Sequence, residues 1–179
     1  PFAGLTDAGV AIGAAILLLP DIFDDRPGAK RIHLRYNWIH DNNRPNTASP
    51  GSILASVPSG LGILYLGVDD SEITRNVVER NDSVGIGTVD YCVAVAQTAF
   101  DCKVDPTATP EFKLDSITTN IRVIDNAVRD NGLNPDPSHP FAFAASDLAL
   151  ISFGTGNCYL RNMFATFGGI FSPPPPECP

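Results

Sequence analysis

The sequence predicts an all-β protein folded as a right-handed parallel β-helix, a solenoid in which each coil of the chain stacks on the one before it. Three observations predict this fold: a gapless internal repeat, an asparagine that recurs inside it, and turn residues clustered between short apolar runs. Sixteen prolines and fifteen glycines in 179 residues suit short strands separated by turns. We expect a single domain over residues 1–179, with regular coils over about residues 8–167.

The repeat consists of four segments with one template: an apolar residue, two variable residues, Asn, one variable residue, an apolar residue, two variable residues and Asn. Such self-similarity is the signature of stacked architectures. We interpret each segment as a strand, a tight turn at the first Asn and a second strand, because apolar residues five apart do not fit a helical period. The segments are residues 32–42, 71–81, 121–131 and 157–167, with Phe167 replacing the last Asn.

Three columns of the repeat are predicted to stack from coil to coil. Two are apolar and should point inward: Leu34, Ile73, Val123 and Tyr159, then Ile39, Val78, Val128 and Phe164. The third should form an asparagine ladder, since Asn tolerates left-handed backbone angles and stacked amides can hydrogen-bond one another. It consists of Asn37, Asn76, Asn126 and Asn162, at spacings of 39, 50 and 36 residues.

A second type of strand is expected between the repeat segments, in residues 62–66 and 85–89, with further versions in residues 8–12 and 141–144. The longest apolar run, residues 10–19, suits a strand buried on both faces. Variation in coil length is assigned to three surface loops rich in Pro, Asp, Thr and Ser. They lie at about residues 44–59, 90–115 and 132–140.

Four cysteines indicate an oxidising compartment, so we expect the chain to be secreted, periplasmic or on the cell surface. Three connectivities are open, and the local pairs Cys92 with Cys102 and Cys158 with Cys178 are favoured. A cysteine metal site is the alternative, but no CxxC spacing or His-adjacent Cys occurs. The second pair would tie back a C-terminal cap over residues 154–179.

The N-terminal coil shows no capping element, and a bare first coil would expose strand edges and apolar core. We therefore expect upstream coils or a protein partner at that end. A net charge of −8 with scattered basic residues argues against nucleic acid as a partner. No stretch reaches the roughly 20 apolar residues of a membrane helix, so no transmembrane segment is expected.

Charged residues alternate in sign from coil to coil at three positions beside the ladder. One interpretation is an outward charge ladder that pairs neighbouring coils and aids register. The sharper alternative is an acid/base surface around His40, Asp41 and Arg80. The columns are Tyr36, Arg75, Asp125 and Arg161; His40, Glu79, Arg129 and Ala165; and Asp41, Arg80, Asp130 and Thr166.

No metal or other cofactor is expected, with Ca²⁺ as the one alternative, bound through oxygen ligands of Asp101 and Asp105 or of the pairs at 24–25 and 69–70. None has the spacing of a dedicated calcium loop, so solvated turn carboxylates are favoured. His33, His40 and His139 share no metal-ligand spacing.

Aromatic residues leave two interpretations open. Tyr36, Trp38 and Tyr65 would form a sugar-stacking platform if they are exposed, whereas packing at the coil corner is favoured for Trp38. Packing in the core or the cap is expected for four phenylalanines: Phe141, Phe143, Phe164 and Phe167.

The Asn-x-Ile/Val-x-x-Asn turn and its Gly-Ile strand resemble the parallel β-helix repeat of pectate-lyase-like proteins, over about residues 32–167. More narrowly, several stretches look like the C-terminal half of a bacterial family of secreted right-handed parallel β-helix repeat proteins. They are residues 15–20, 37–43, 50–58 and 62–63, and the terminal stretch from 156–158 to 176–178. The resemblance implies the fold and export, and similarity in fold to polysaccharide lyases.

Two functions from different classes are expected. The first is an exported structural or interaction module, a subunit or scaffold of a larger extracytoplasmic assembly, and this interpretation leans against an enzyme. The second is a carbohydrate-active β-helix, lyase-like or glycan-binding, that acts on an acidic polysaccharide. A lyase needs a cation or Arg to neutralise the substrate carboxylate and a base to remove the neighbouring proton. Fold alone does not decide between them.

Overall fold

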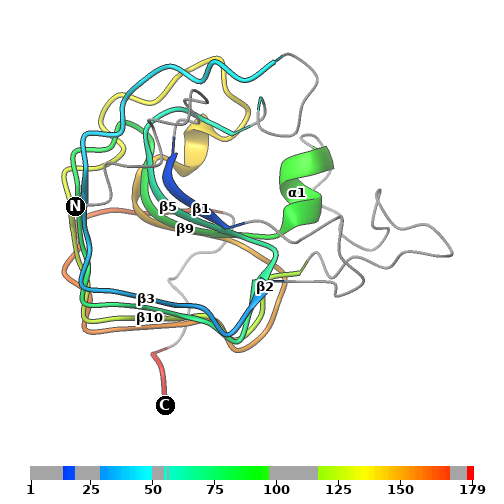
Figure 1. Cartoon of the computed structure of the whole chain (residues 1–179), viewed down its shortest axis with the longest axis vertical. Coiled ribbons are helices and arrows are strands. Elements are labelled where there is room, and N and C mark those ends of the chain that lie inside the picture. The colour runs from blue at the N-terminus through cyan, green and yellow to red at the C-terminus, as the bar shows by residue number, and fades with distance from the viewer. Residues whose placement is uncertain (1–13, 19–28, 50–54, 56, 97–116, 170–176) are drawn as a thin grey trace, which may run out of the picture.

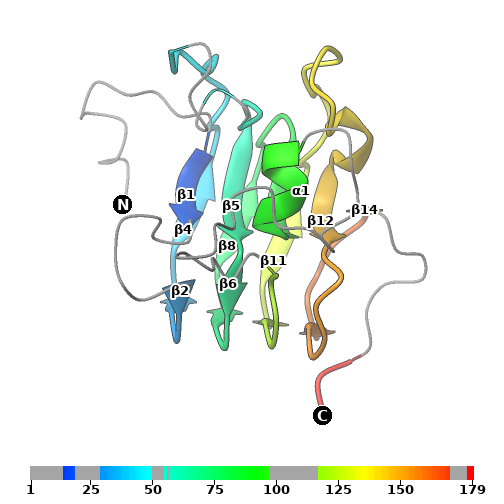
Figure 2. The same ribbon diagram turned by 90° about the vertical axis from the view of Figure 1, so that its right-hand side faces the viewer.

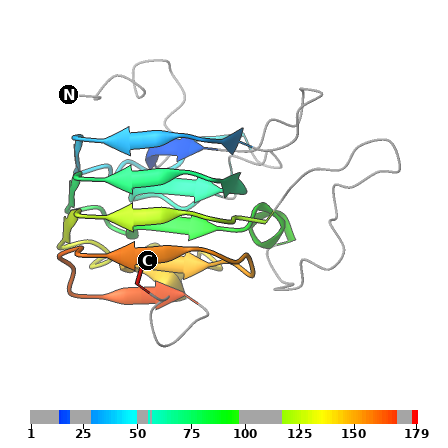
Figure 3. The same ribbon diagram turned by 90° about the horizontal axis from the view of Figure 1, so that it is seen from below.

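The computed structural model describes residues 14–18, 29–49, 55, 57–96, 117–169 and 177–179. This part of the chain is all-β, with one short α-helix, α1 (Tyr91–Ala96), and one 3₁₀ turn, η3 (Ala142–Ala144). The strands pair in parallel and stack in sheets, an arrangement compatible with the predicted parallel β-helix (Figures 1 and 3). Within the described ranges, no helix has the length and apolar character needed to cross a membrane.

Four sheets, named A to D in the order in which the chain meets them, make up the stack. Sheet A contains β1 (Ala14–Leu18), β5 (Leu61–Leu66), β9 (Val84–Val89), β12 (Ser146–Ile151) and β14 (Phe167–Gly169). Sheet B pairs β2 (Ala29–Lys30) with β6 (Val68–Asp69). Sheet C contains β3 (His33–Arg35), β7 (Glu72–Thr74), β10 (Arg122–Ile124) and β13 (Cys158–Leu160). Sheet D contains β4 (Trp38–His40), β8 (Val77–Glu79) and β11 (Ala127–Arg129).

The chain adds a strand to the same sheets each time it passes through them, and we call the strands of one passage a layer. Layer 1 holds β1 to β4, layer 2 holds β5 to β8, layer 3 holds β9 to β11, and layer 4 holds β12 and β13. Figure 2 shows these layers side by side, from blue to orange. Residues far apart in the sequence are therefore direct neighbours across layers.

The strand register confirms the predicted repeat. In sheet C, Leu34 pairs with Ile73, Ile73 with Val123 and Val123 with Tyr159. Sheet D aligns the second apolar column in the same way, from Ile39 to Val128. In the two middle layers these side chains are fully buried, and they join the inner face of sheet A in one core. The inward columns are thus the main source of hydrophobic burial.

Phe164 was predicted to continue the second apolar column, and this prediction is wrong, because its side chain is 41 % exposed. After Met163, which bridges to Ala127, the chain reaches sheet A again at Phe167. This last corner is shorter than those of the earlier layers, so Phe164 does not stack on Val128. Phe167 instead closes the core and meets the ring of Tyr159 edge-on, 5.9 Å between centroids.

The second strand type is confirmed at residues 62–66 and 85–89, which lie in β5 and β9. Part of the apolar run 10–19 forms β1, whereas residues 8–12 lie outside the described residues. The strand predicted at 141–144 is wrong: those residues enter η3, and the strand β12 follows it. Alternation of Phe and Ala misled the prediction, because Phe141 packs against the outer face of sheet A while Phe143 is 53 % exposed.

Two of the predicted loops rise on the same side of the stack, next to sheet A. They contain residues 41–49 with 57–60, and residues 130–145 (Figures 1 and 2). Val57 from the first loop and Phe141 from the second contribute to a second apolar cluster, on the outer face of sheet A, which α1 also joins through Val93. Sheet A is therefore apolar on both faces, which explains its continuous apolar strands.

The backbone at each ladder turn corrects the predicted role of Asn. The left-handed residue is the one before the ladder Asn, namely Tyr36, Arg75, Asp125 and Arg161, with φ of 60°, 54°, 57° and 51°. A left-handed conformation costs a non-glycine residue roughly 1–2 kcal/mol. The left-handed residue of the turn is thus the one before the predicted Asn. The Asn contributes the hydrogen bonds of its side chain to the turn, and its own backbone is not left-handed.

The predicted asparagine ladder is present in all four layers. The side-chain oxygen of Asn76 accepts both the backbone N–H and the side-chain amide of Asn37, at 3.0 and 2.9 Å. The oxygen of Asn126 does the same for Asn76, at 2.9 and 3.0 Å, and that of Asn162 for Asn126, at 2.9 Å each. The ladder thus satisfies a buried backbone donor and a side-chain donor at each step.

A second ladder, which the sequence interpretation missed, runs through the last Asn of the repeat. Asn42 donates to the side-chain oxygen of Asn81, and Asn81 to that of Asn131. Asn131 then donates to Asp147, from its backbone and its side chain, at 3.0 Å each. The other carboxylate oxygen of Asp147 accepts the backbone N–H of Ala165 at 2.9 Å. A single buried carboxylate therefore ends this ladder and fixes the shortened last corner.

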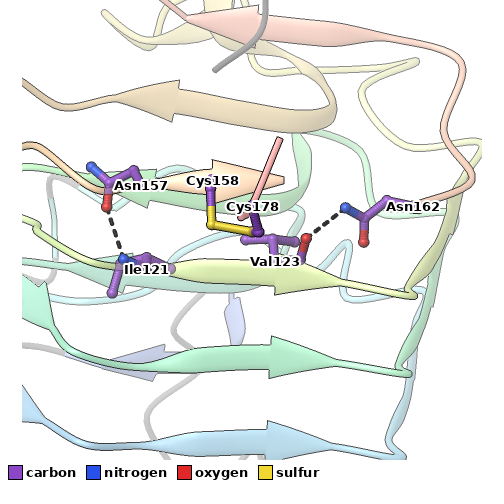
Figure 4. Close-up of a disulfide and its surroundings, with 6 residues drawn as sticks. All are labelled: Ile121, Val123, Asn157, Cys158, Asn162 and Cys178. Atoms are coloured by element: carbon purple, nitrogen blue, oxygen red, sulfur yellow. Dashed lines mark hydrogen bonds between the residues drawn. A yellow bond between two sulfur atoms is a disulfide. The ribbon is translucent and has the colours of Figure 1, made fainter. Parts of the chain in front are cut away.

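The predicted pair Cys158–Cys178 forms a disulfide on the outer side of sheet C (Figure 4). It ties the end of the described chain to β13, beside the Asn157 side chain, whose oxygen accepts the Ile121 N–H at 3.0 Å. Cys92 is disulfide-bonded and buried, and its predicted partner Cys102 lies outside the described residues.

Replacing Asn76 with Leu should destabilise the protein strongly. The substitution leaves the backbone N–H of Asn37 without its acceptor. The side-chain oxygen of Asn126 also loses the hydrogen bond that the Asn76 side chain donates to it. Unsatisfied buried groups cost about 1–3 kcal/mol each, so we expect a loss of about 3 kcal/mol. For a chain of this size that lowers the Tm by roughly 6–12 °C, measurable by circular dichroism. Asn37→Leu, in the half-buried first layer, should cost less, and an equal loss would contradict a cooperative ladder.

Candidate functional site

The residues proposed as an acid/base surface meet on the outer face of sheet D. His40 Nδ1 lies 2.6 Å from Asp41 Oδ2, and Arg80 Nη2 lies 2.8 Å from the same oxygen. A second guanidinium contact joins Arg80 Nε to Asp41 Oδ1 at 3.1 Å. The three side chains are therefore in contact, as the sequence columns predicted, and Arg80 binds the carboxylate with both arms of its fork.

Glu79 is the residue of this cluster whose role the sequence interpretation missed. It was placed in an outward column, yet the residue is only 3 % exposed. Its Oε1 accepts hydrogen bonds from Arg80 Nη1 at 2.6 Å and from Trp38 Nε1 at 3.1 Å. Its Oε2 accepts from Arg129 Nε at 2.8 Å. Glu79 thus links three layers, and the signal in the sequence was its position between His40 and Arg129 in one column.

The paired arginines determine the ionisation of both carboxylates. Hydrogen bonds from Arg129, then Arg80 and Trp38, lower the pKa of Glu79 to about 2. Hydrogen bonds from Arg80 and His40 lower the pKa of Asp41 to about 2. A general base works best with a pKa near the operating pH, and these carboxylates hold their protons far too weakly. The contacts across layers therefore fit a charge ladder, the first of the two sequence interpretations.

The remaining charge column is also paired across layers. Arg161 Nε donates to Asp125 Oδ1 at 2.7 Å, and Arg75 contacts the hydroxyl of Tyr36 and lies over its ring, 5.7 Å from the centroid. These pairs are exposed, and pairs of this kind contribute only about 0–1 kcal/mol each. These pairs affect the register between layers more than the stability of the fold, because a different alignment of the layers would place like charges opposite each other.

The aromatic platform is only partly assembled. Tyr36 is 65 % and Trp38 is 61 % exposed, so the predicted corner packing of Trp38 is wrong. Tyr36 occupies the left-handed position of the turn, and Trp38 donates its indole N–H to Glu79. Tyr65 is fully buried in β5 and takes no part in a surface platform.

The acidic pair at residues 69–70, one of the calcium candidates, uses its carboxylates for structure. Asp69 Oδ1 accepts the Thr119 N–H at 3.0 Å and its Oδ2 lies 3.2 Å from Lys30 Nζ, while Asp70 accepts from the Asn120 side chain at 2.9 Å. In the part of the chain that the structure describes, no three His, Cys, Asp or Glu side chains are placed to hold a metal ion. The calcium candidates Asp101 and Asp105, with residues 24–25, lie outside that part.

A polar groove of about 310 Å³ follows the outer face of sheet C. Its walls carry four arginines against two carboxylates, in a chain whose net charge is −8. The arginines are Arg35, Arg75, Arg122 and Arg161. The sequence interpretation treated the basic residues as scattered, although each repeat segment carries one of these four. The missed signal is that each repeat segment carries an arginine on this side, so the four arginines come together when the layers stack.

A second recess lies between the two loops on sheet A. It is a small cavity of about 50 Å³ lined mainly by apolar side chains, among them Val57, Leu64 and Phe141. Its lining belongs to the apolar cluster on the outer face of sheet A, so it contributes no chemical group beyond packing.

No family of proteins, no curated protein and no solved structure matches this chain. The predicted kinship with pectate-lyase-like and secreted β-helix repeat proteins therefore remains a prediction.

The pairing of Glu79 gives a testable dependence of stability on pH. Because its pKa falls from 4.5 unfolded to about 2 folded, the ionised group stabilises the fold above pH 4.5. That contribution is lost as the pH falls from 4.5 to about 2. We expect the Tm of the wild type to fall more steeply over this interval than the Tm of Glu79→Gln.

Glu72→Gln is the matched control for this experiment. It removes the same charge from β7, where Glu72 lies 3.4 Å from His33 rather than between two arginines. The control should keep the steep acid limb of the wild type. Parallel acid limbs for Glu79→Gln and the wild type would show that the buried carboxylate is not the group responsible.

Proposed function

We propose that this chain is an exported, right-handed parallel β-helix that works as a non-catalytic structural and interaction module of a larger extracytoplasmic assembly. The observation that carries this proposal is the use of its charged side chains. The candidate acid/base residues bind one another across layers, and the carboxylates of Asp41 and Glu79 are held ionised by arginine. Side chains committed in this way build a rigid surface rather than a reactive centre.

Export is supported by the disulfides. Cys158 and Cys178 are bonded, Cys92 is bonded as well, and no cysteine among the described residues is free. Disulfides persist in oxidising compartments and are rare in the cytosol of most organisms. The pectate-lyase-like kinship that the repeat suggests agrees with this location.

Assembly is supported by the edges of layer 1. Among the described strands, β1 to β4 each pair on one side only, with their layer 2 neighbours. Unpaired edges invite association with further strands or another chain. We propose that additional coils or a protein partner lie against this face of the stack.

The mass of the native particle tests the assembly. Extracted from its source without denaturant, the particle that contains this chain should be heavier than the 19.0 kDa of the sequence alone. Native mass spectrometry gives the particle mass, and a denaturing measurement on the same sample separates a longer chain from a complex. A free particle of 19.0 kDa would overturn the assembly proposal.

A second candidate function is a carbohydrate-active β-helix. The arginine-lined groove on sheet C favours it, because guanidinium groups bind carboxylates in bidentate geometry. A lyase would further need a base close to those arginines. The two carboxylates in the groove, Glu72 and Asp125, lie beside His33 and Arg161, and Arg161 lowers the pKa of Asp125. The groove thus supports binding of an acidic polysaccharide better than its cleavage.

Incubation with pectate or alginate distinguishes the two functions. A lyase produces unsaturated sugars that absorb in the ultraviolet, and we expect no rise in absorbance with or without Ca²⁺. An authentic pectate lyase serves as the positive control for the substrate. A rise that depends on the protein in either condition would establish the catalytic function instead.

A further inference from the structure

The outer face of sheet D carries an apolar column that crosses all four layers. In layers 1 to 3 the residue after each member points into the core, so the members themselves face outward. The two end residues are widely exposed, Trp38 at 61 % and Met163 at 69 %, and the two between them are half-buried. The column consists of Trp38, Val77, Ala127 and Met163. An exposed apolar patch with charged residues beside it is typical of an interaction surface.

Trp38 is held in place on this face before any partner arrives. Its indole N–H donates to Glu79 of the next layer at 3.1 Å, and its ring lies 4.3 Å from the His40 ring between centroids. Glu79 is 3 % exposed and is itself held by Arg80 and Arg129. The indole is therefore tied across to layer 2. An aromatic side chain that is ordered in advance loses little conformational entropy on binding, and such residues often dominate interfaces.

The charges beside the apolar column have opposite signs in layers 2 and 3. Arg80 follows β8 and Asp130 follows β11, and both take the left-handed conformation, with φ of 54° and 56°. Arg80 is paired with Asp41 and Glu79, whereas Asp130 is exposed and makes no ion pair or side-chain hydrogen bond with the described residues. In the neighbouring column, Glu79 of layer 2 stands beside Arg129 of layer 3. Reversing the order of the layers therefore reverses the sign at both positions.

We propose that this face binds the same face of a second copy of the chain, with the layers of the two copies running in opposite directions. The proposal rests on the interaction module proposed above and adds a contact between two copies to it. A twofold axis parallel to the strands, between layers 2 and 3, sets layer 1 against layer 4 and layer 2 against layer 3. Arg80 then faces the Asp130 of the second copy, and this pair occurs twice. Trp38 faces the Met163 of the second copy, a favourable contact between sulfur and an aromatic ring.

Other arrangements of two copies place like charges together. An axis through layer 2 would set Arg80 against the Arg80 of the second copy and Asp41 against its Asp130. An axis through layer 3 would bring the two Asp130 carboxylates together. An axis along the stacking direction would lay the charged turn of one copy on the apolar column of the other. Like charges at an interface disfavour the wrong pairing, so the charges select the reversed arrangement.

The size of the face predicts a weak dimer. Four layers at about 4.8 Å and four residues at about 3.3 Å give a face of roughly 19 by 13 Å. A standard interface buries roughly 800 Å² on each partner, so this contact is smaller. We therefore expect a reversible dimer that forms as the protein concentration rises.

Sedimentation velocity of the whole chain, at concentrations that rise into the millimolar range, tests the proposal. The interface variants are Asp130→Arg and Met163→Gln. Asp130→Arg should fold, because the same left-handed position carries Arg80 in layer 2. The matched control is Glu177→Arg, which makes the same change of charge beside the disulfide on sheet C. The Tm of each variant shows that it is folded.

The wild type should sediment as a reversible mixture of monomer and dimer. Asp130→Arg should raise the Kd of the dimer by roughly tenfold or more, because it sets like charges against Arg80 in both copies. Met163→Gln should raise the Kd by roughly fivefold, because the contact with Trp38 is lost twice. Glu177→Arg should leave the Kd unchanged. Salt at about 1 M should restore part of the Asp130→Arg dimer, because it screens charges beyond roughly 3 Å.

Three results would overturn the proposal: a monomer at every concentration, an equal Kd for Asp130→Arg and Glu177→Arg, or no recovery of the Asp130→Arg dimer in salt. A dimer that persists unchanged in both interface variants uses another surface, such as the edges of layer 1, and overturns it as well. The assembly proposal is tested by the mass of the native particle instead, so the two proposals fail separately.

Discussion

The stack depends on one shared acceptor, the side-chain oxygen of an asparagine that receives two hydrogen bonds from the Asn of the preceding layer. Each ladder turn places a non-glycine residue in a left-handed conformation, at a cost of roughly 1–2 kcal/mol. An amide hydrogen bond contributes about 1 kcal/mol net, and the side chain and backbone N–H of Asn76 make five of them, two fully buried. The ladder thus offsets the strain of the turn and fixes which residue faces which across layers.

Much of the architecture could be predicted from the sequence because each layer of the ladder repeats the same pattern of apolar and Asn residues. The spacings of 39, 50 and 36 residues between ladder asparagines are the sequence separations of the hydrogen bonds that join them. The inward positions of Ile73 and Val128 follow from the same alignment. Loops of any length can be inserted between repeats without disturbing this pattern, since each repeat is held by its neighbours in other layers.

The failures have local physical causes. Asp147 occupies the register position that Gly62 has in β5 and Gly85 has in β9. The repeat template specified only apolar and Asn positions, so it could not predict a carboxylate there. A Cβ on Gly85 would lie 2.8 Å from the Asn131 amide nitrogen, and the Asp147 carboxylate reaches the same amide from the next layer. The arginine groove was missed for another reason. Its four members occupy three different columns, and only the stacking of layers brings them into one groove.

The acceptor-only carboxylate of Asp147 gives the second ladder a polarity. Each ladder oxygen accepts hydrogen bonds from the layer before it. Asp147 accepts in this way from Asn131, but its carboxylate has no N–H to donate to a following layer, so the ladder cannot continue past it. On the opposite side, the side-chain oxygens of Asn37 and Asn42 receive no hydrogen bond from the described residues, and each can accept two more. The second ladder therefore has one terminated end and one end whose chemistry permits growth, as a polymer with a capped and an uncapped terminus does.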